Sequence, residues 1–129
     1  MRSLRRARDL LVSNYGRADG WYVELDDQRV AELTRVNFED MFWDSYEVSA
    51  NTYDDAPQIR DDALWAAARF CFRNRRTGEL VATAFCGGTA PFVRNGRVRI
   101  RGLHLRANTV AERVCLRVLQ FLLPRHTRR

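Results

Sequence analysis

The stretch RFCFRNRRTGELVATAFC, residues 69–86, decides the fold because its pattern is that of two β-strands joined by a tight turn. Phe70 and Phe72 fall on one face of the first strand, since successive side chains of a strand point to opposite faces. Gly78 stands where a bulged hairpin turn needs a residue with positive φ, and an apolar strand follows over residues 80–86. The segment therefore predicts an antiparallel hairpin.

Segments before this hairpin predict further strands. Residues 21–34 have the pattern of a second hairpin, which turns at residues 26–28. Residues 41–48 alternate apolar and polar side chains, as a half-buried strand does. Residues 38–41 predict a short helical turn, and residues 49–62 are acidic and without periodicity, which predicts an exposed loop.

The last predicted strand follows a strong turn signal. Asn95-Gly96 is a preferred pair for a two-residue hairpin turn, and residues 97–106 alternate basic and apolar side chains after it. The alternation breaks at Gly102. A β-bulge at this glycine would return the next two leucines to the core, so we expect one there.

Two helices are predicted at the ends of the chain. Thr109 and Glu112 have the spacing of a capping box, and Pro124 cannot continue a helix, so residues 110–123 predict one. Apolar side chains cover more than half of its circumference, and such a helix needs cover from a curved sheet or from a partner chain. Ser3 predicts the start of a short N-terminal helix.

Together these elements predict one α+β domain over residues 1–129. We expect mainly antiparallel β-structure over residues 20–106, as a strongly curved sheet or partly open barrel of five to seven strands. A short N-terminal helix over residues 1–15 precedes the sheet, and the C-terminal helix over residues 109–123 packs against it. A chain of this length buries roughly two-thirds of its unfolded surface, which is enough for one core.

Composition indicates an ordinary globular protein, with 46% hydrophobic and 29% charged residues. The longest uncharged stretch, residues 80–93, is too short and too rich in glycine and proline for a membrane-spanning helix, and we expect no secretory leader. Cys71, Cys86 and Cys115 are widely spaced in apolar runs, which predicts buried free thiols. Free thiols indicate a reducing compartment, so we expect a cytoplasmic protein.

Charge is divided unequally along the chain. All 22 basic residues are arginine, and there is no lysine. Residues 1–16 carry a net charge of +3, residues 17–62 carry −9 and residues 63–129 carry +12. Unequal charge of this kind predicts either internal neutralisation or an electrostatic interaction with another molecule.

The arginines of the last strand form the first candidate site. Arg97, Arg99 and Arg101 share one face about 7 Å apart, close to the spacing of phosphates along a nucleic-acid strand. Arg94 and Arg73 extend this predicted surface for nucleic acid or a partner protein. The alternative is that carboxylates of neighbouring strands neutralise these arginines. The carboxylates available for this are those of Glu24, Asp26, Glu32, Asp44 and Glu47.

A second candidate is a ligand pocket inside the curved sheet, lined by aromatic side chains. Its members are Trp21, Tyr22, Phe42, Trp43 and Tyr46. The aspartates of residues 49–62 lack the spacing and the glycine of an EF-hand, and Gly87-Gly88 lacks the lysine of a phosphate loop. We therefore expect no metal site and no cofactor, and we assign no catalytic residue.

The sequence does not determine the function. The preferred interpretation is a non-enzymatic binding or assembly module that associates with a second copy of itself or with a partner protein, and not with a membrane. One alternative is weak nucleic-acid binding through the arginine strand. Another is a small-molecule or enzymatic site inside the curved sheet. The absence of a specific catalytic signature favours a role other than catalysis.

Overall fold

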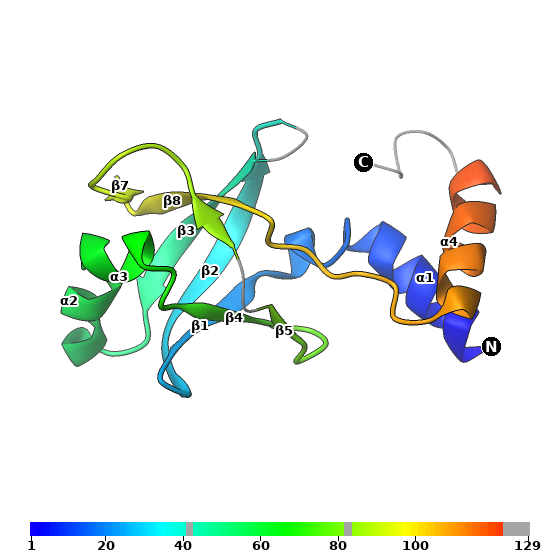
Figure 1. Ribbon diagram of the computed structural model, residues 1–129, viewed down its shortest axis with the longest axis horizontal. Coiled ribbons are helices and arrows are strands. Elements are labelled where there is room, and N and C mark those ends of the chain that lie inside the picture. The colour runs from blue at the N-terminus through cyan, green and yellow to red at the C-terminus, as the bar shows by residue number, and fades with distance from the viewer. Residues whose placement is uncertain (41–42, 82–83, 123–129) are drawn as a thin grey trace. The chain divides into compact units, whose positions relative to one another are not determined.

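The computed structural model describes residues 1–40, 43–81 and 84–122 of the 129-residue chain (Figure 1). The chain divides into two compact units. The helical unit comprises residues 1–18 and 104–129, and the sheet unit comprises residues 19–103. That the two fold together as a single domain stays a prediction.

One antiparallel sheet dominates the sheet unit. Among the described residues it has eight strands, seven of them on a continuous path in the order β5-β4-β1-β2-β3-β8-β6, with β7 paired to β8 beside the path. All pairings are antiparallel. The strands are β1 (Trp21–Leu25), β2 (Gln28–Phe38), β3 (Trp43–Ala50), β4 (Cys71–Asn74), β5 (Leu80–Val81), β6 (Phe85–Cys86), β7 (Val93–Arg94) and β8 (Arg97–Arg101).

Chain connectivity forces this sheet to curve. The strands at the two ends of the path, β5 and β6, are separated by only three residues along the chain. Consecutive Cα atoms are 3.8 Å apart, so the two edges lie within about 15 Å of each other. The edges of a flat seven-stranded sheet would stand roughly 29 Å apart. No pairing among the described residues joins β5 to β6, so the predicted partly open, mainly antiparallel sheet is confirmed.

The turns predicted from local sequence are confirmed. Asp26 and Asp27, between β1 and β2, have φ values of +50° and +65°. Asn95 and Gly96 likewise have φ values of +53° and +74° between β7 and β8. Gly78 has a φ of +76° in the turn between β4 and β5, a conformation that costs glycine little.

Two strand boundaries differ from the prediction. The helical turn predicted over residues 38–41 is wrong, because β2 continues to Phe38, which pairs with Asp44; Met41 lies outside the described residues. The predicted strand over residues 97–106 ends at Arg101 without a bulge, because the backbone bends at Gly102, where φ is +86°. The two leucines after this glycine are nevertheless buried, as predicted.

The predicted acidic loop is partly helical. It contains η2 (Tyr53–Asp55) and α2 (Ala56–Ile59), and α3 (Asp62–Ala66) follows; η1 (Arg17–Asp19) is a further short helix. The backbone N–H of Ala63 donates to Asp61 Oδ1 at 3.0 Å, which caps α3. Buried Trp65 anchors α3, since its indole N–H donates to the Ile59 carbonyl at 2.7 Å and its ring centroid lies 4.6 Å from that of Phe70.

The sheet core lies on the concave face. Trp21, Leu33 and Tyr46 are fully buried, and the Trp21 indole N–H donates to the Tyr46 hydroxyl at 3.1 Å. Asp44, on the same face of β3 as Tyr46, is only 3% exposed. Ser45, next in the chain and on the opposite face, is also buried, so both faces of β3 are covered at this point.

The helical unit consists mainly of α1 (Arg2–Val12) packed against α4 (Val110–Leu122). The predicted cap at Thr109 is confirmed, because Thr109 Oγ1 accepts from the Glu112 N–H at 3.1 Å. The Glu112 carboxylate accepts in turn from the Asn108 N–H at 2.8 Å, one residue before the Thr109 N–H that a regular capping box uses. Ser3 is not a cap, because α1 already begins at Arg2. Within the helical unit α4 packs against α1, and that the sheet covers the C-terminal helix stays a prediction.

Candidate functional site

Strand β8 carries the predicted arginine ladder on its outer face. Val98 and Ile100 are buried at the concave face, so Arg97, Arg99 and Arg101 point to the other side. Opposite them on β3 lie Glu47, Ser45 and Trp43, in that order.

Arg97 is held by neutral oxygen atoms. Its Nη2 donates to the carbonyl oxygens of Arg35 at 2.7 Å and Ser45 at 2.9 Å, and its Nε lies 3.3 Å from Ser45 Oγ. Ser45 is buried, so one side of this guanidinium is fixed on the sheet. Its charge is therefore oriented by these contacts but not neutralised by them.

Arg94 is held in a similar way by the loop that precedes β7. Its Nε donates to the Pro91 carbonyl at 2.8 Å, and its Nη2 donates to the Thr89 carbonyl at 3.0 Å. Both partners are again uncharged. The loop thus folds back on the side chain that follows it and holds the guanidinium in place.

Arg99, unlike Arg94 and Arg97, has a carboxylate partner that neutralises its charge. Its Nε donates to Glu39 Oε2, and its guanidinium carbon lies 5.0 Å from the centre of a Trp43 ring. Gly87 packs closely on both neighbours, because a Cβ atom there would lie 2.9 Å from the Trp43 ring and 3.2 Å from Arg99 Cβ. Only glycine lets this loop approach the strand so closely.

These residues surround an open cleft of about 230 Å³. We call it the arginine cleft, and it is lined by Glu39, Ser45, Gly87, Gly88, Pro91, Phe92, Arg94, Arg97, Val98 and Arg99. Three positive side chains and one negative side chain give the lining a net charge of +2. Three of the five arginines predicted as a site are therefore brought together, whereas Arg101 is not among the lining residues.

Arg73 does not belong to this group. It lies on β4, which three strands separate from β8 in the sheet. Its Nε and Nη2 donate to the two carboxylate oxygens of Glu24, at 2.7 Å and 3.3 Å, and this bonding raises the pKa of Arg73. Here the predicted neutralisation by a neighbouring strand holds. Asp26 contacts Arg69 at 3.2 Å instead, and neither of these two residues lies in a strand.

The predicted aromatic residues lie on two faces of the sheet. Trp21 and Tyr46 are buried in the core, and Trp43 lies on the outer face beside Arg99. Tyr22 packs under the guanidinium of Arg29, with 3.4 Å from the guanidinium carbon to the ring centre. Phe42 lies outside the described residues. The four described side chains therefore do not form one cluster.

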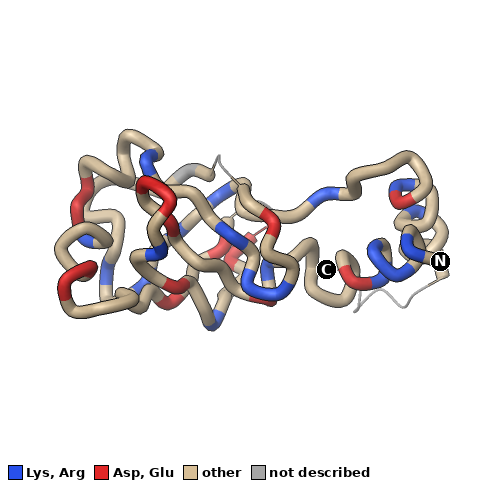
Figure 2. Tube along the Cα trace, turned by 90° about the horizontal axis from the view of Figure 1, so that it is seen from below, with Lys and Arg blue, Asp and Glu red and all other residues tan. Residues whose placement is uncertain are grey.

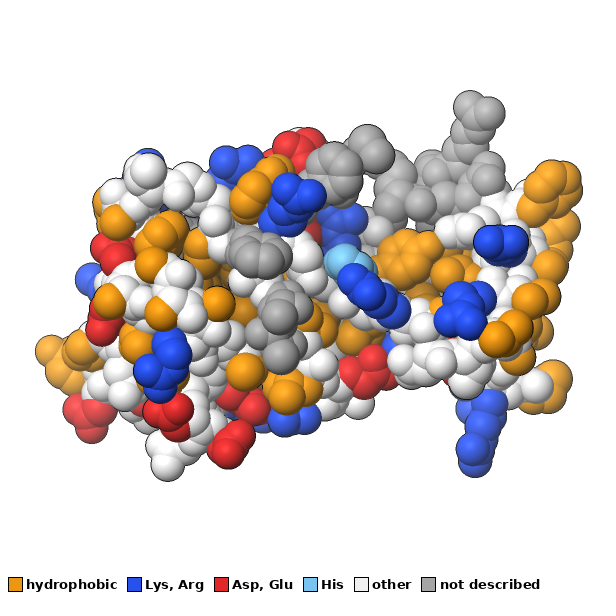
Figure 3. Space-filling model, in the orientation of Figure 1, with side chains coloured by type: hydrophobic (Ala, Val, Ile, Leu, Met, Phe, Trp, Pro, Cys, Tyr) orange, Lys and Arg blue, Asp and Glu red, His pale blue; other side chains and the backbone are white. Residues whose placement is uncertain are grey.

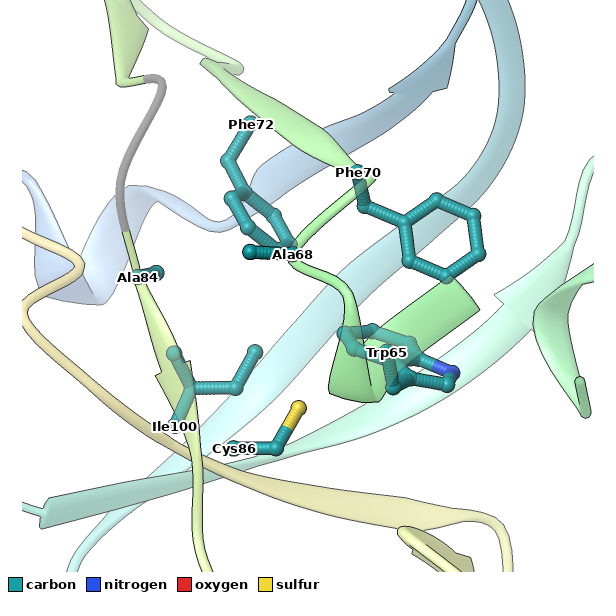
Figure 4. Close-up of a pocket in the computed structure, with 7 residues that line it drawn as sticks. All are labelled: Trp65, Ala68, Phe70, Phe72, Ala84, Cys86 and Ile100. Atoms are coloured by element: carbon teal, nitrogen blue, oxygen red, sulfur yellow. The ribbon is translucent and has the colours of Figure 1, made fainter. Parts of the chain in front are cut away.

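A small cavity of about 10 Å³ lies inside the curved sheet, lined by Trp65, Ala68, Phe70, Phe72, Ala84, Cys86 and Ile100 (Figure 4). This volume holds about one water molecule. The Cys86 thiol points into it, and burial raises the pKa of this thiol to about 12, so it is not poised as a nucleophile.

The helical unit presents a different surface. No described residue of α4 is buried, and its large apolar side chains stand in solvent along one side of the helix (Figure 3). Their exposed fractions are 66% for Val110, 56% for Val114, 51% for Val118, 86% for Phe121 and 69% for Leu122. We call these five residues the α4 face. Sequence periodicity indicated a helix that needs cover but not which side stays open.

The two units also differ in charge (Figure 2). By sequence the helical unit has eleven arginines and two acidic residues, a net charge of +9. The sheet unit has eleven arginines and fourteen acidic residues, a net charge of −3. Net charges of opposite sign are thus carried by separate parts of the chain.

No group of three or more metal-ligating side chains occurs among the described residues. In the same part of the chain, no helix has the length and apolar character needed to cross a membrane. Comparison with protein families, with curated proteins and with solved structures finds no match to this chain.

Proposed function

We propose that this protein is a non-enzymatic assembly module, in which the α4 face of one copy docks on the acidic sheet unit of a second copy. The observation that carries this proposal is the exposure of five large apolar side chains on α4. Contiguous exposed apolar surface on a folded protein marks interaction sites. The three free cysteines support a cytoplasmic setting for this assembly.

The geometry of the helix suits a docking face. At 3.6 residues per turn the five side chains fall within an arc of about 120°. Arg113 and Arg117, both exposed, border one side of this arc. An apolar centre with a charged edge is the usual arrangement of a protein interface.

Charge complementarity favours a second copy in a head-to-tail arrangement. Two helical units of +9 repel each other, whereas a helical unit attracts a sheet unit of −3. The sheet unit offers a matching surface at η2, where Tyr53 is 93% exposed beside the exposed Asp54. Such a heterologous contact would build rings or open chains.

The area of the α4 face predicts that the contact depends on salt. A helix of 13 residues is about 20 Å long and about 10 Å wide, which is well below the roughly 800 Å² per partner of a stable interface. The surrounding charges must therefore contribute. Interactions between exposed charges are screened at high ionic strength.

Light scattering at low and high salt tests the proposal. The wild type should exceed the 15.1 kDa of one chain at low salt and approach it at high salt. Val114→Ser/Phe121→Ser, which removes apolar surface without changing charge, should stay monomeric. Leu80→Ser is the matched control, because Leu80 is 50% exposed on β5 in the sheet unit, and it should associate like the wild type.

Two outcomes would contradict the proposal. One is a wild type that remains monomeric at both salt concentrations, which would leave the α4 face to a foreign partner. The other is a Val114→Ser/Phe121→Ser variant that associates as well as the wild type.

Nucleic-acid binding through the arginine strand stays a second proposal, supported by the convergence of Arg94, Arg97 and Arg99 on one cleft. Neutralisation of Arg99 by Glu39 reduces the charge available to a phosphate backbone. A small-molecule site at the aromatic residues has no comparable observation in its favour.

A further inference from the structure

Two guanidinium groups of the arginine cleft have no carboxylate partner among the described residues. Arg94 donates to two backbone carbonyls, and Arg97 donates to two backbone carbonyls and a hydroxyl. Arg99, by contrast, is paired with Glu39. An arginine is always protonated, so both unpaired charges persist at any physiological pH.

The same contacts leave one nitrogen of each guanidinium without a hydrogen-bond acceptor among the described residues. In each of the two side chains Nε and Nη2 are engaged, and Nη1 donates to none of the residues that the structure describes. Backbone carbonyls hold the engaged nitrogens, so the guanidinium planes are fixed before any ligand arrives. Binding to groups that are already ordered loses less conformational entropy.

We propose that the arginine cleft binds a phosphate group carried by a phosphate ester, held between Arg94 and Arg97. The net charge of +2 on the lining matches a phosphomonoester dianion, and planar guanidinium groups match the geometry of phosphate oxygens. The volume of about 230 Å³ exceeds the needs of a bare phosphate, which leaves room for an organic group beside Pro91 and Phe92. This site is independent of the α4 face.

Glu39 sets the strength of this site. Its carboxylate lines the cleft and repels an anion, while it holds Arg99 in place. Removing its charge should therefore tighten phosphate binding, because the net charge of the lining rises from +2 to +3. Binding can be followed by the fluorescence of Trp43, because its ring lies 5.0 Å from the Arg99 guanidinium carbon and the other two tryptophans are buried.

The test is a titration with inorganic phosphate at low ionic strength. Calorimetry and tryptophan fluorescence detect the binding, and a titration with chloride at equal ionic strength is the blank. The monomeric Val114→Ser/Phe121→Ser background keeps self-association out of the measurement. Arg94→Ala and Arg97→Ala should each weaken binding by on the order of tenfold, because each removes charge-assisted hydrogen bonds. Arg69→Ala removes the same charge outside the cleft and should leave the affinity unchanged.

Two further ligands show which kind of molecule carries the phosphate, and a further variant tests the role of Glu39. A nucleoside 5′-monophosphate that binds more tightly than phosphate supports a small phosphorylated ligand. A single-stranded oligonucleotide that binds more tightly still, and is lost in Arg94→Ala/Arg97→Ala, supports a nucleic-acid backbone. Glu39→Gln should tighten every ligand severalfold. The proposal would be overturned if phosphate, the nucleoside monophosphate and the oligonucleotide all failed to bind. It would also be overturned if Arg94→Ala/Arg97→Ala bound these ligands as tightly as the protein with both arginines intact.

Discussion

In the sheet unit Trp21, Leu33 and Tyr46 are fully buried, whereas α4 of the helical unit buries none of its described side chains. The sheet unit also pairs several arginines with its own carboxylates, such as Arg73 with Glu24. The helical unit has too few acidic residues to do the same. The sheet unit thus pairs much of its charge internally, whereas the helical unit exposes the apolar side chains of the α4 face and carries a large excess of arginine.

The largest effect expected from this difference is on stability. Trp21→Ala should lower the free energy of unfolding by about 3–5 kcal/mol, since it removes a fully buried indole and leaves a cavity. Phe121→Ala should change it by no more than about 0.5 kcal/mol, because Phe121 is 86% exposed. Urea unfolding at high salt measures both. Similar losses in the two variants would show that the α4 face is part of the core.

The half-buried position of Cys86 in the sheet unit, where the sequence predicted a buried thiol, still predicts slow thiol chemistry. Burial disfavours the charged thiolate, so the pKa of Cys86 is raised to about 12 and the thiol stays protonated as the pH rises toward that value. At pH 9 about one thiol in a thousand is ionised. Alkylation followed by mass spectrometry should label Cys86 several hundredfold more slowly in the folded protein than in urea. Equal rates would mean that the sheet interior is open.

The cap of α4 should matter because this helix buries none of its described side chains. Thr109→Ala removes the hydroxyl that accepts from the Glu112 N–H and should cost about 1 kcal/mol. Hydrogen exchange should become faster in the first turn of α4. Thr52→Ala is a suitable control, since the Thr52 hydroxyl makes no capping hydrogen bond to the backbone. Unchanged exchange in Thr109→Ala would show that other contacts hold this turn.

The smallest effect concerns the charged edge of the α4 face. Arg113→Gln/Arg117→Gln should weaken self-association only severalfold at low salt and hardly at all at high salt, because single exposed charges contribute little. Arg60→Gln/Arg69→Gln removes the same charge from the sheet unit and should not weaken it. Sedimentation at a series of protein concentrations compares the variants. An equal loss in both pairs would mean that total charge, and not its position, controls association.

Features that depend on neighbouring residues were predictable from the sequence. The turns at Gly78 and at Asn95-Gly96 follow from backbone conformations that few residues tolerate. The capping box at Thr109 and Glu112 joins residues three apart. Each signal needs only a few consecutive residues, so no knowledge of the tertiary fold was required.

Features that depend on distant residues were not predictable. Glu39 neutralises Arg99 across 60 positions of sequence, which requires the register of three strands. The burial of both Asp44 and Ser45 could not be inferred, because alternation does not say what covers each face of a strand. The pairing of α4 with α1 could not be inferred, since the apolar pattern of a helix does not identify its partner.

A mixing experiment tests the head-to-tail contact most directly. Val114→Ser/Phe121→Ser lacks the α4 face but keeps the acidic surface, whereas Tyr53→Ser/Asp54→Lys lacks the acidic surface but keeps the α4 face. Each variant alone should be a monomer of 15.1 kDa, and an equimolar mixture at low salt should form a pair of twice that mass and nothing larger. A mixture that stays at the mass of one chain would contradict the account.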